Sequence, residues 1–238
     1  IGMVTDALAR RNLKVAYGTR NMAKGPAMTR EQAEQAIRAG IAMAEELKGQ
    51  GYQILATGEM GIGNTTTSSA VASVLLNQPV EKMTGRGAGL SSEGLLRKIR
   101  TIEKAIQLNQ PDPEDPVDVL AKVGGLDIAG LTGVYLGGAA LGVPVVMDGF
   151  ISCVAALAAR KMCELAGDYM IPSHMSKEPA SRLLMETLGK DPVIHGDMCL
   201  GEGTGAVALF PFLDMGAKLY NSLSTFEDIH VEQYEELK

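Results

Sequence analysis

The chain has 238 residues, 46% of them hydrophobic and 21% charged, so it is long and apolar enough to bury one large core. Its formal net charge of −6 argues against a nucleic-acid surface, because proteins that bind nucleic acids usually display a basic face. The longest apolar runs, at 143–147 and 151–159, are too short to cross a membrane. We therefore expect a single large domain over residues 1–238, with no nucleic-acid partner and no membrane partner.

Cysteine and histidine spacing indicates neither a disulfide framework nor a metal site. The three cysteines are an odd number without a CxxC pair, and no segment resembles a signal peptide. We expect reduced, buried thiols in a cytoplasmic protein. His174, His195 and His230 lack the spacing of metal ligands, so we predict no metal and no cofactor.

The first clear helix is predicted over residues 30–48. Thr29 is placed to cap it, and Gln32 stands where a capping box needs a glutamine. Apolar residues recur on one face, and Gly49 and Gly51 end the pattern.

Strand, turn and helix then alternate along the chain, which is typical of a parallel sheet covered on both faces. We predict strand 52–57 with helix 65–76, strand 143–147 with helix 150–161, and strand 169–171 with helix 176–188. Ser176 is placed to cap the last of these helices. Residues 109–118 contain three prolines and are predicted to form a loop, and a long apolar helix follows Gly205 to about residue 220. The fold class is α/β, a three-layer α/β/α arrangement with a mainly parallel, Rossmann-like sheet.

Ligands of such folds bind beyond the carboxyl ends of the strands, so the turns there are the candidate sites. The turn at 58–64 is rich in glycine and precedes a helix that Asn64 or Thr65 could cap. Close backbone approach and free N–H groups of a first helical turn favour an anion. The turn indicates a phosphate cradle, although it lacks the P-loop ending. The alternative is that these glycines only make a tight turn.

A second glycine-rich turn, at 84–89, contains Arg86 and precedes a helix that carries Lys98. These two cations could complete a phosphate site in an otherwise acidic protein. The alternative is a mobile loop beside a solvated helix face.

The third turn, at 201–205, places Glu202 between Gly201 and Gly203. The apolar helix that follows would desolvate this glutamate and raise its pKa, as a general base requires. The alternative is a glutamate that only stabilises the helix dipole.

Four motifs occur together in this chain: GEMGIGNTTT at 58–67, DGF at 148–150, IPSHMS at 171–176 and LGEGTGA at 200–206. The order and approximate spacing of these motifs resemble those of the nicotinate-nucleotide:dimethylbenzimidazole phosphoribosyltransferases. The resemblance extends from GPAMTREQA at 25–33 through the last helix. Family members carry a further segment upstream, and the first residues, IGMVTDAL, look like the exit of a strand. We therefore expect a preceding segment that supplies part of the base pocket.

The resemblance implies a role for each matching residue. Glu202 matches the catalytic glutamate and Glu59 a second acid near the reacting base. The groups expected around the ribose phosphate of nicotinate mononucleotide are Gly58, Gly61, Gly85, Gly87 and Lys98. Those expected around the nicotinate end are Asp148, Gly149 and Ser176. Further candidates for substrate contact in the same turns and motifs are Met60, Asn64, Thr65, Thr66, Arg86, Phe150, Ser173, His174, Leu200, Gly201 and Gly203.

The implied activity is that of a pentosyltransferase. It moves the 5-phosphoribosyl group from nicotinate mononucleotide to 5,6-dimethylbenzimidazole or a related base, giving α-ribazole 5′-phosphate and nicotinate for the lower ligand of cobalamin. The resemblance also implies a homodimer.

Two other functions are considered. The chain could bind the nucleotide without catalysis, as a fragment or regulatory homologue. A nucleotide-linked dehydrogenase is disfavoured, because a fitting GxGxxG and its later acidic residue are missing from the sequence.

Overall fold

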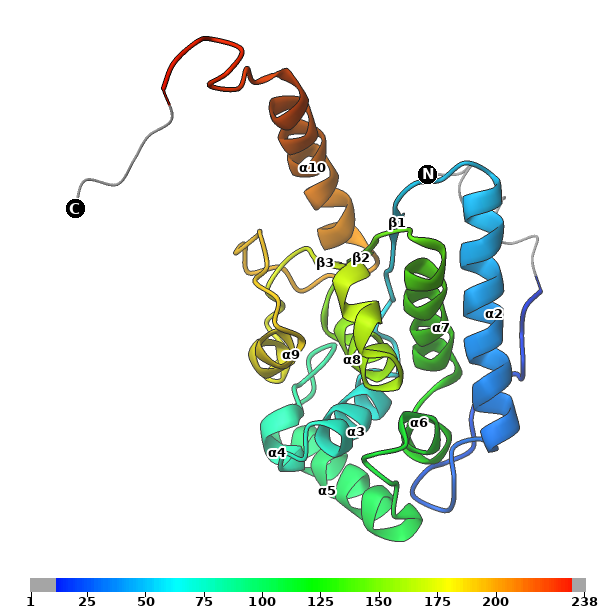
Figure 1. Cartoon of the computed structure of the whole chain (residues 1–238). Helices are drawn as coiled ribbons and strands as arrows, with labels where there is room; N and C mark the ends of the chain where they lie inside the picture. Colours follow the sequence, from blue (N-terminus) through cyan, green and yellow to red (C-terminus); the bar gives the residue numbers. More distant parts are fainter. Residues whose placement is uncertain (1–11, 233–238) are drawn as a thin grey trace.

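The computed structural model describes residues 12–232, in which helices surround a small sheet (Figure 1). The strand exit predicted over residues 1–8 lies outside the described residues. In chain order the elements are α2 (Arg30–Gly49), β1 (Leu55–Ala56), α3 (Thr65–Leu75), α4 (Val80–Met83), α5 (Ser92–Asn109), α6 (Pro116–Val123), α7 (Leu126–Leu141), β2 (Val145–Met147), α8 (Phe150–Met162), the 3-10 helix η1 (Glu164–Tyr169), β3 (Met170–Pro172), α9 (Ser181–Leu188) and α10 (Thr204–Ser222).

The sheet is parallel, with strand order β1-β2-β3, and it has helices on both faces. Val145 packs in the main core, where its side chain meets Gly138 of α7. Val146 points to the other face and packs with Ala206 and Leu209 of α10, because successive strand residues face opposite sides. The predicted α/β class and parallel sheet are confirmed, although the strands are only two or three residues long.

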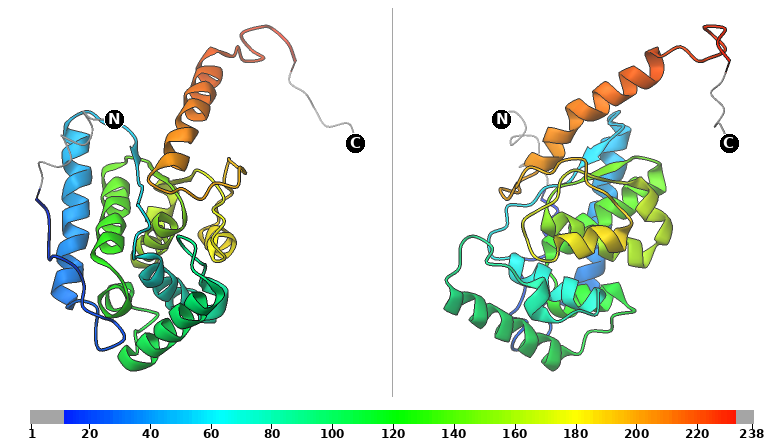
Figure 2. Two further views of the ribbon diagram at one scale, coloured as in Figure 1. Left: turned by 180° about the vertical axis from the view of Figure 1, so that it is seen from behind. Right: turned by 90° about the vertical axis from the view of Figure 1, so that its left-hand side faces the viewer.

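Helices α2 and α7 lie side by side along their length (Figures 1 and 2). The predicted capping box of α2 is confirmed, with Thr29 accepting from the N–H of Gln32 at 3.2 Å. Helix α7 was not predicted, because its sequence carries four glycines, which weaken a helix. These glycines serve the packing: a Cβ added at Gly133 would clash with the carbonyl oxygen of Ile37.

Gly133→Ala is therefore expected to destabilise the fold by about 1–3 kcal/mol, the usual cost of overpacking a well-filled contact. Urea denaturation followed by circular dichroism measures the change. Gly216→Ala in α10 is the matched control, because a Cβ there meets no atom within 4 Å. Equal stability of the two variants would contradict close packing of α2 on α7.

Three local predictions are wrong for identifiable reasons. Helix α9 begins at Ser181 instead of residue 176, because Pro179 disfavours a helical conformation at the residue before it. Ser176 therefore caps no helix, and its Oγ accepts from the N–H of Glu178 at 3.4 Å. Helix α6 begins inside the predicted loop, with Pro116 at its first position and Asp115 as its cap.

The cysteines also differ from expectation. Cys153 is buried, and burial raises the pKa of its thiol to about 12, but Cys163 and Cys199 are exposed. No helix within residues 12–232 is long and apolar enough to span a membrane.

Helix α10 projects from the body of the molecule (Figures 1 and 2). Its first turns are anchored by Ala206 and Leu209, which are fully buried. Farther along, it exposes large apolar side chains, among them Phe212, Met215 and Leu219.

Candidate active site

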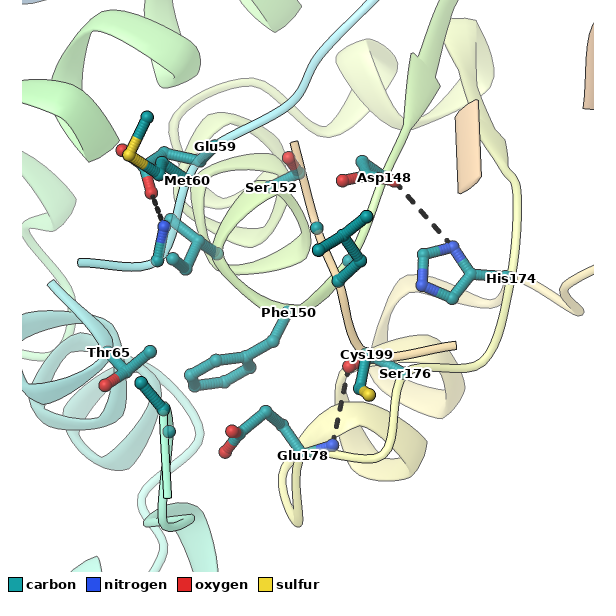
Figure 3. A pocket seen from close by; sticks show the side chains of 17 residues that line it. Glu59, Met60, Thr65, Asp148, Phe150, Ser152, His174, Ser176, Glu178 and Cys199 are labelled. Atoms are coloured by element: carbon teal, nitrogen blue, oxygen red, sulfur yellow. Dashed lines mark hydrogen bonds and ion pairs between the residues drawn. The ribbon is translucent and has the colours of Figure 1, made fainter. Parts of the chain in front are cut away.

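A cavity of about 170 Å³ opens where all three strands end (Figure 3). The segments that follow β1, β2 and β3 form its walls, together with the turns at 87–88 and 199–201. This is where a parallel sheet with helical crossovers places its ligands. The lining residues are Glu59, Met60, Gly61, Thr65, Gly87, Ala88, Asp148, Gly149, Phe150, Ile151, Ser152, His174, Ser176, Glu178, Cys199, Leu200 and Gly201.

Asp148 holds the start of α10 in place. It directly follows β2 and is almost fully buried, at 1% exposure. One carboxylate oxygen accepts from the N–H of Gly203 at 2.9 Å, and the other accepts from Gly205 at 2.9 Å and Ala206 at 3.3 Å. A carboxylate at a helix N-terminus satisfies its unpaired N–H groups and favours its dipole. Asp148 therefore fixes the turn that carries Glu202.

The turns at 58–61 and 201–203 interlock through their main chains. The N–H of Glu202 donates to the carbonyl oxygen of Glu59 at 2.9 Å. A Cβ added at Gly58 would clash with the backbone of Gly203, so only glycine permits this approach. Glu202 itself has a positive φ of 59°. A main-chain hydrogen bond therefore joins the two candidate catalytic acids, Glu59 and Glu202, directly.

The two acids have different surroundings. Glu59 is half-buried and lines the cavity, and its Oε2 accepts from the N–H of Gly61 at 2.5 Å. Glu202 is exposed and does not line the cavity, although the preceding residue, Gly201, does. The expectation that the helix after Glu202 desolvates it is wrong, because α10 leads away from the turn and projects from the body (Figure 1).

Lys98 is the buried cation of this region, with only 7% of its surface exposed. Its Nζ donates to Thr65 Oγ1 and to the carbonyl oxygen of Gly85, both at 3.0 Å. Burial lowers the pKa of Lys98, and the nearby carboxylate of Glu178 opposes that shift. The alternative of a solvated helix face does not hold for Lys98.

Arg86 and Asn64 are engaged elsewhere. The guanidinium of Arg86 donates to the carbonyl oxygen of Leu90 at 2.7 Å and to Ser92 Oγ at 3.0 Å, and it does not line the cavity. The Asn64 amide donates to Asp127 at 2.6 Å instead of capping α3, contrary to prediction. Within residues 12–232 no side chain caps α3, which leaves N–H groups of its first turn for solvent or an anion.

His174 lines the cavity and is buried. Its Nδ1 lies 3.0 Å from Ser173 Oγ and 3.9 Å from an Asp148 oxygen. Burial lowers the pKa of His174 from its usual 6.5, against the opposing charge of Asp148. A neutral imidazole is therefore expected here at neutral pH.

Because the pKa of His174 is lowered, the free energy of unfolding is predicted to decrease as the pH is lowered. The unfolded chain binds a proton near the usual pKa of 6.5, whereas folded His174 does so only at lower pH. Its contribution is complete above that value and is lost as pH falls below it. The urea midpoint should decline between about pH 7.5 and about pH 5.5, and less steeply in His174→Gln. His195→Gln, at an exposed position, serves as the control; equal slopes in all three proteins would contradict the role of His174.

The structure places the predicted residues in two groups. Those that line the cavity are Glu59, Met60, Gly61, Thr65, Gly87, Asp148, Gly149, Phe150, His174, Ser176, Leu200 and Gly201. Those outside the lining are Gly58, Asn64, Thr66, Gly85, Arg86, Lys98, Ser173, Glu202 and Gly203.

Sequence reasoning missed Ala88, Ile151, Ser152, Glu178 and Cys199, which also line the cavity. The signal that could have found Glu178 is its position two residues after the IPSHMS motif. Within residues 12–232 no group of three or more His, Cys, Asp or Glu side chains is arranged to hold a metal ion.

Comparisons with known proteins agree in pointing to one family. A family model described as phosphoribosyltransferase matches residues 1–231. The chain is 54% identical over 222 residues to the nicotinate-nucleotide–dimethylbenzimidazole phosphoribosyltransferase of Acetivibrio thermocellus, covering 93% of this chain and 63% of that protein. It is 52% identical over 227 residues to the protein of the same name from Ruminiclostridium cellulolyticum, covering 95% of this chain and 64% of the relative. The chain thus spans less than two thirds of either relative.

Solved structures are similar throughout the described fold. The crystal structure of CobT from Thermus thermophilus matches with a TM-score of 0.88 and 41% identity. The match covers 94% of this chain and 67% of that one.

Proposed function

Because the chain belongs to the phosphoribosyltransferase family, we propose that it moves the 5-phosphoribosyl group of nicotinate mononucleotide to 5,6-dimethylbenzimidazole or a related base. The products are α-ribazole 5′-phosphate, for the lower ligand of cobalamin, and nicotinate. One observation carries this proposal. The hydrogen-bonded turns of Glu59 and Glu202 border a cavity, and the buried Lys98 lies next to the same cavity through its contact with Thr65.

The phosphate end of the nucleotide is proposed to bind between Lys98 and the first turn of α3. Lys98 supplies a charge that burial keeps poorly solvated, so an anion gains more from it than from an exposed lysine. Thr65 and Gly87 face the cavity at this end. The first-turn N–H groups of α3 add a favourable dipole.

The base is proposed to enter near Met60 and Leu200. Both line the cavity and remain largely exposed, at 59% and 65%, so they offer apolar surface at its mouth. Phe150 adds an aromatic ring (Figure 3). A flat, apolar base would cover these side chains when it binds.

In the transfer step, one benzimidazole nitrogen attacks C1′ of the ribose while the bond from C1′ to the nicotinate nitrogen breaks. The pyridinium leaves as a neutral pyridine, so it needs little acid assistance. The other ring nitrogen of the base gives up its proton, and Glu202 is the proposed acceptor. Positioning of the attacking nitrogen in line with C1′ supplies much of the rate.

We further propose that the chain folds as one domain, forms a homodimer and works in the cytoplasm. The exposed apolar side chains of α10 support self-association, because burying them against a second copy removes apolar surface from water. Light scattering that gives twice the chain mass of 25.1 kDa would support the dimer. The free thiols fit a reducing compartment.

A chromatographic assay of nicotinate release tests the transfer. Nicotinate mononucleotide is incubated with and without dimethylbenzimidazole, and the Acetivibrio thermocellus relative serves as the positive control. Release that depends on the base supports the transferase. If this chain binds the nucleotide and the relative alone releases nicotinate, the non-catalytic binding function replaces it.

A further inference from the structure

Glu178 is a cavity residue to which the proposed transfer assigns no role. It lies between β3 and α9, and its side chain extends into the cavity toward Phe150 (Figure 3). Its Oε2 is buried and accepts no hydrogen bond from the described residues. A buried, unpaired carboxylate oxygen is costly, so its retention points to a donor that arrives with the ligand.

The carboxylate stands at the phosphate end of the cavity. A Cβ added at Gly85 would clash with Glu178 Oε2, so the carboxylate packs directly against Gly85. The carbonyl oxygen of Gly85 in turn accepts from Lys98 Nζ. The charge of Glu178 also raises the pKa of Lys98 against the effect of burial, so an acid lies near the buried cation.

An acid in this position works against a bare anion. It repels a phosphate dianion and neutralises part of the charge of Lys98. A ligand must therefore bring a neutral donor group close to its phosphate to benefit from Glu178. A ribose 5-phosphate does so, because its hydroxyl-bearing ring is separated from the phosphate by a single methylene group.

We propose that Glu178 accepts hydrogen bonds from the ribose hydroxyls of the bound nucleotide and thereby selects phosphorylated ribose over other anions. This inference rests on the proposed function, since it assumes a phosphate beside Lys98. Ser176 and Thr65 also line the cavity but are hydroxyls, which bind a sugar more weakly than a carboxylate does. Glu178 is thus the specificity-determining residue of the sugar site.

The alternative is that Glu178 only balances the charge of Lys98. The two roles predict opposite results when the carboxylate is removed. Loss of a charge-balancing acid raises the affinity for every anion. Loss of a sugar ligand lowers the affinity for ribose 5-phosphate while inorganic phosphate binds as well as before or better.

Isothermal titration of the wild-type chain, Glu178→Gln and Glu178→Asp with ribose 5-phosphate, 2-deoxyribose 5-phosphate and inorganic phosphate separates the two. In Glu178→Gln we expect about tenfold weaker binding of ribose 5-phosphate, no loss for phosphate, and a smaller preference for ribose over deoxyribose. Glu178→Asp keeps the charge but shortens the reach, so it should lose the same preference. Glu186→Gln, at an exposed position on α9, is the matched control.

Stronger binding of both sugar phosphates to Glu178→Gln would overturn the inference, as would an unchanged preference for ribose in both variants. These results differ from a failure of the proposed function. The proposed transfer fails when the wild-type chain releases no nicotinate in the assay above, whatever its preference for ribose. A wild-type chain that binds neither ribose 5-phosphate nor nicotinate mononucleotide would overturn the nucleotide site itself, and this inference with it.

Discussion

Glu202→Gln is expected to slow phosphoribosyl transfer by about 10²- to 10⁴-fold, the usual contribution of a general base, and to leave the affinity for nicotinate mononucleotide unchanged. Glutamine has the shape of glutamate but cannot accept the proton of the benzimidazole ring. Single-turnover nicotinate release and equilibrium titration with the nucleotide measure the two quantities separately.

The geometry predicts that this substitution leaves the turn intact. Main-chain contacts hold residues 201–203, through the carboxylate of Asp148 and the carbonyl oxygen of Glu59. Within the described residues no hydrogen bond of the turn uses the Glu202 side chain. Loss of nucleotide binding together with activity would therefore count against a role as base. Asp148→Asn is the useful contrast, because it removes an acceptor from the start of α10 and should disturb the turn itself.

Lys98→Met is expected to weaken binding of nicotinate mononucleotide by about 10- to 100-fold, the range for hydrogen bonds to charged groups. Methionine fills a similar volume, so the substitution removes the charge with little change in packing. Isothermal titration measures the loss, and it should persist in salt, because a buried charge is screened less than an exposed one.

Arg97→Met is the matched control, since it removes one positive charge from the adjacent, exposed position of α5. Its affinity should stay close to that of the wild-type chain at moderate ionic strength. Equal losses in the two variants would indicate a general effect of net charge and would argue against a phosphate site at Lys98.

Features fixed by neighbouring residues could be predicted from the sequence. The capping box of Thr29 and Gln32 needs only a three-residue spacing, and it occurs as expected. The strand, turn and helix order also located the cavity, because parallel strands bring the turns after them to one edge. The glycine turns therefore indicated the part of the molecule where the cavity lies.

Features that depend on distant contacts could not be predicted. Asn64 donates to Asp127, which is 63 positions away, and so does not act as the local cap that its sequence suggests. Asp148 accepts from the backbone at the start of α10, 55 to 58 positions later. The exposure of Glu202 depends on the direction in which α10 leaves the body, which hydrophobic periodicity does not encode. The contact of the Glu178 carboxylate with Gly85 likewise joins two segments that are distant in the sequence.

The interlocked turns and the cavity mouth differ in how freely laboratory evolution can vary their residues. Any side chain at Gly58 would push away the backbone that carries Glu202, although residue 58 need not touch a substrate. Met60 and Leu200, by contrast, end in open space at the cavity mouth. A saturation library for new acceptor bases should therefore diversify these two positions together and leave Gly58 fixed. If the proposed transfer holds, such a library changes the range of accepted bases while Glu202 stays in place.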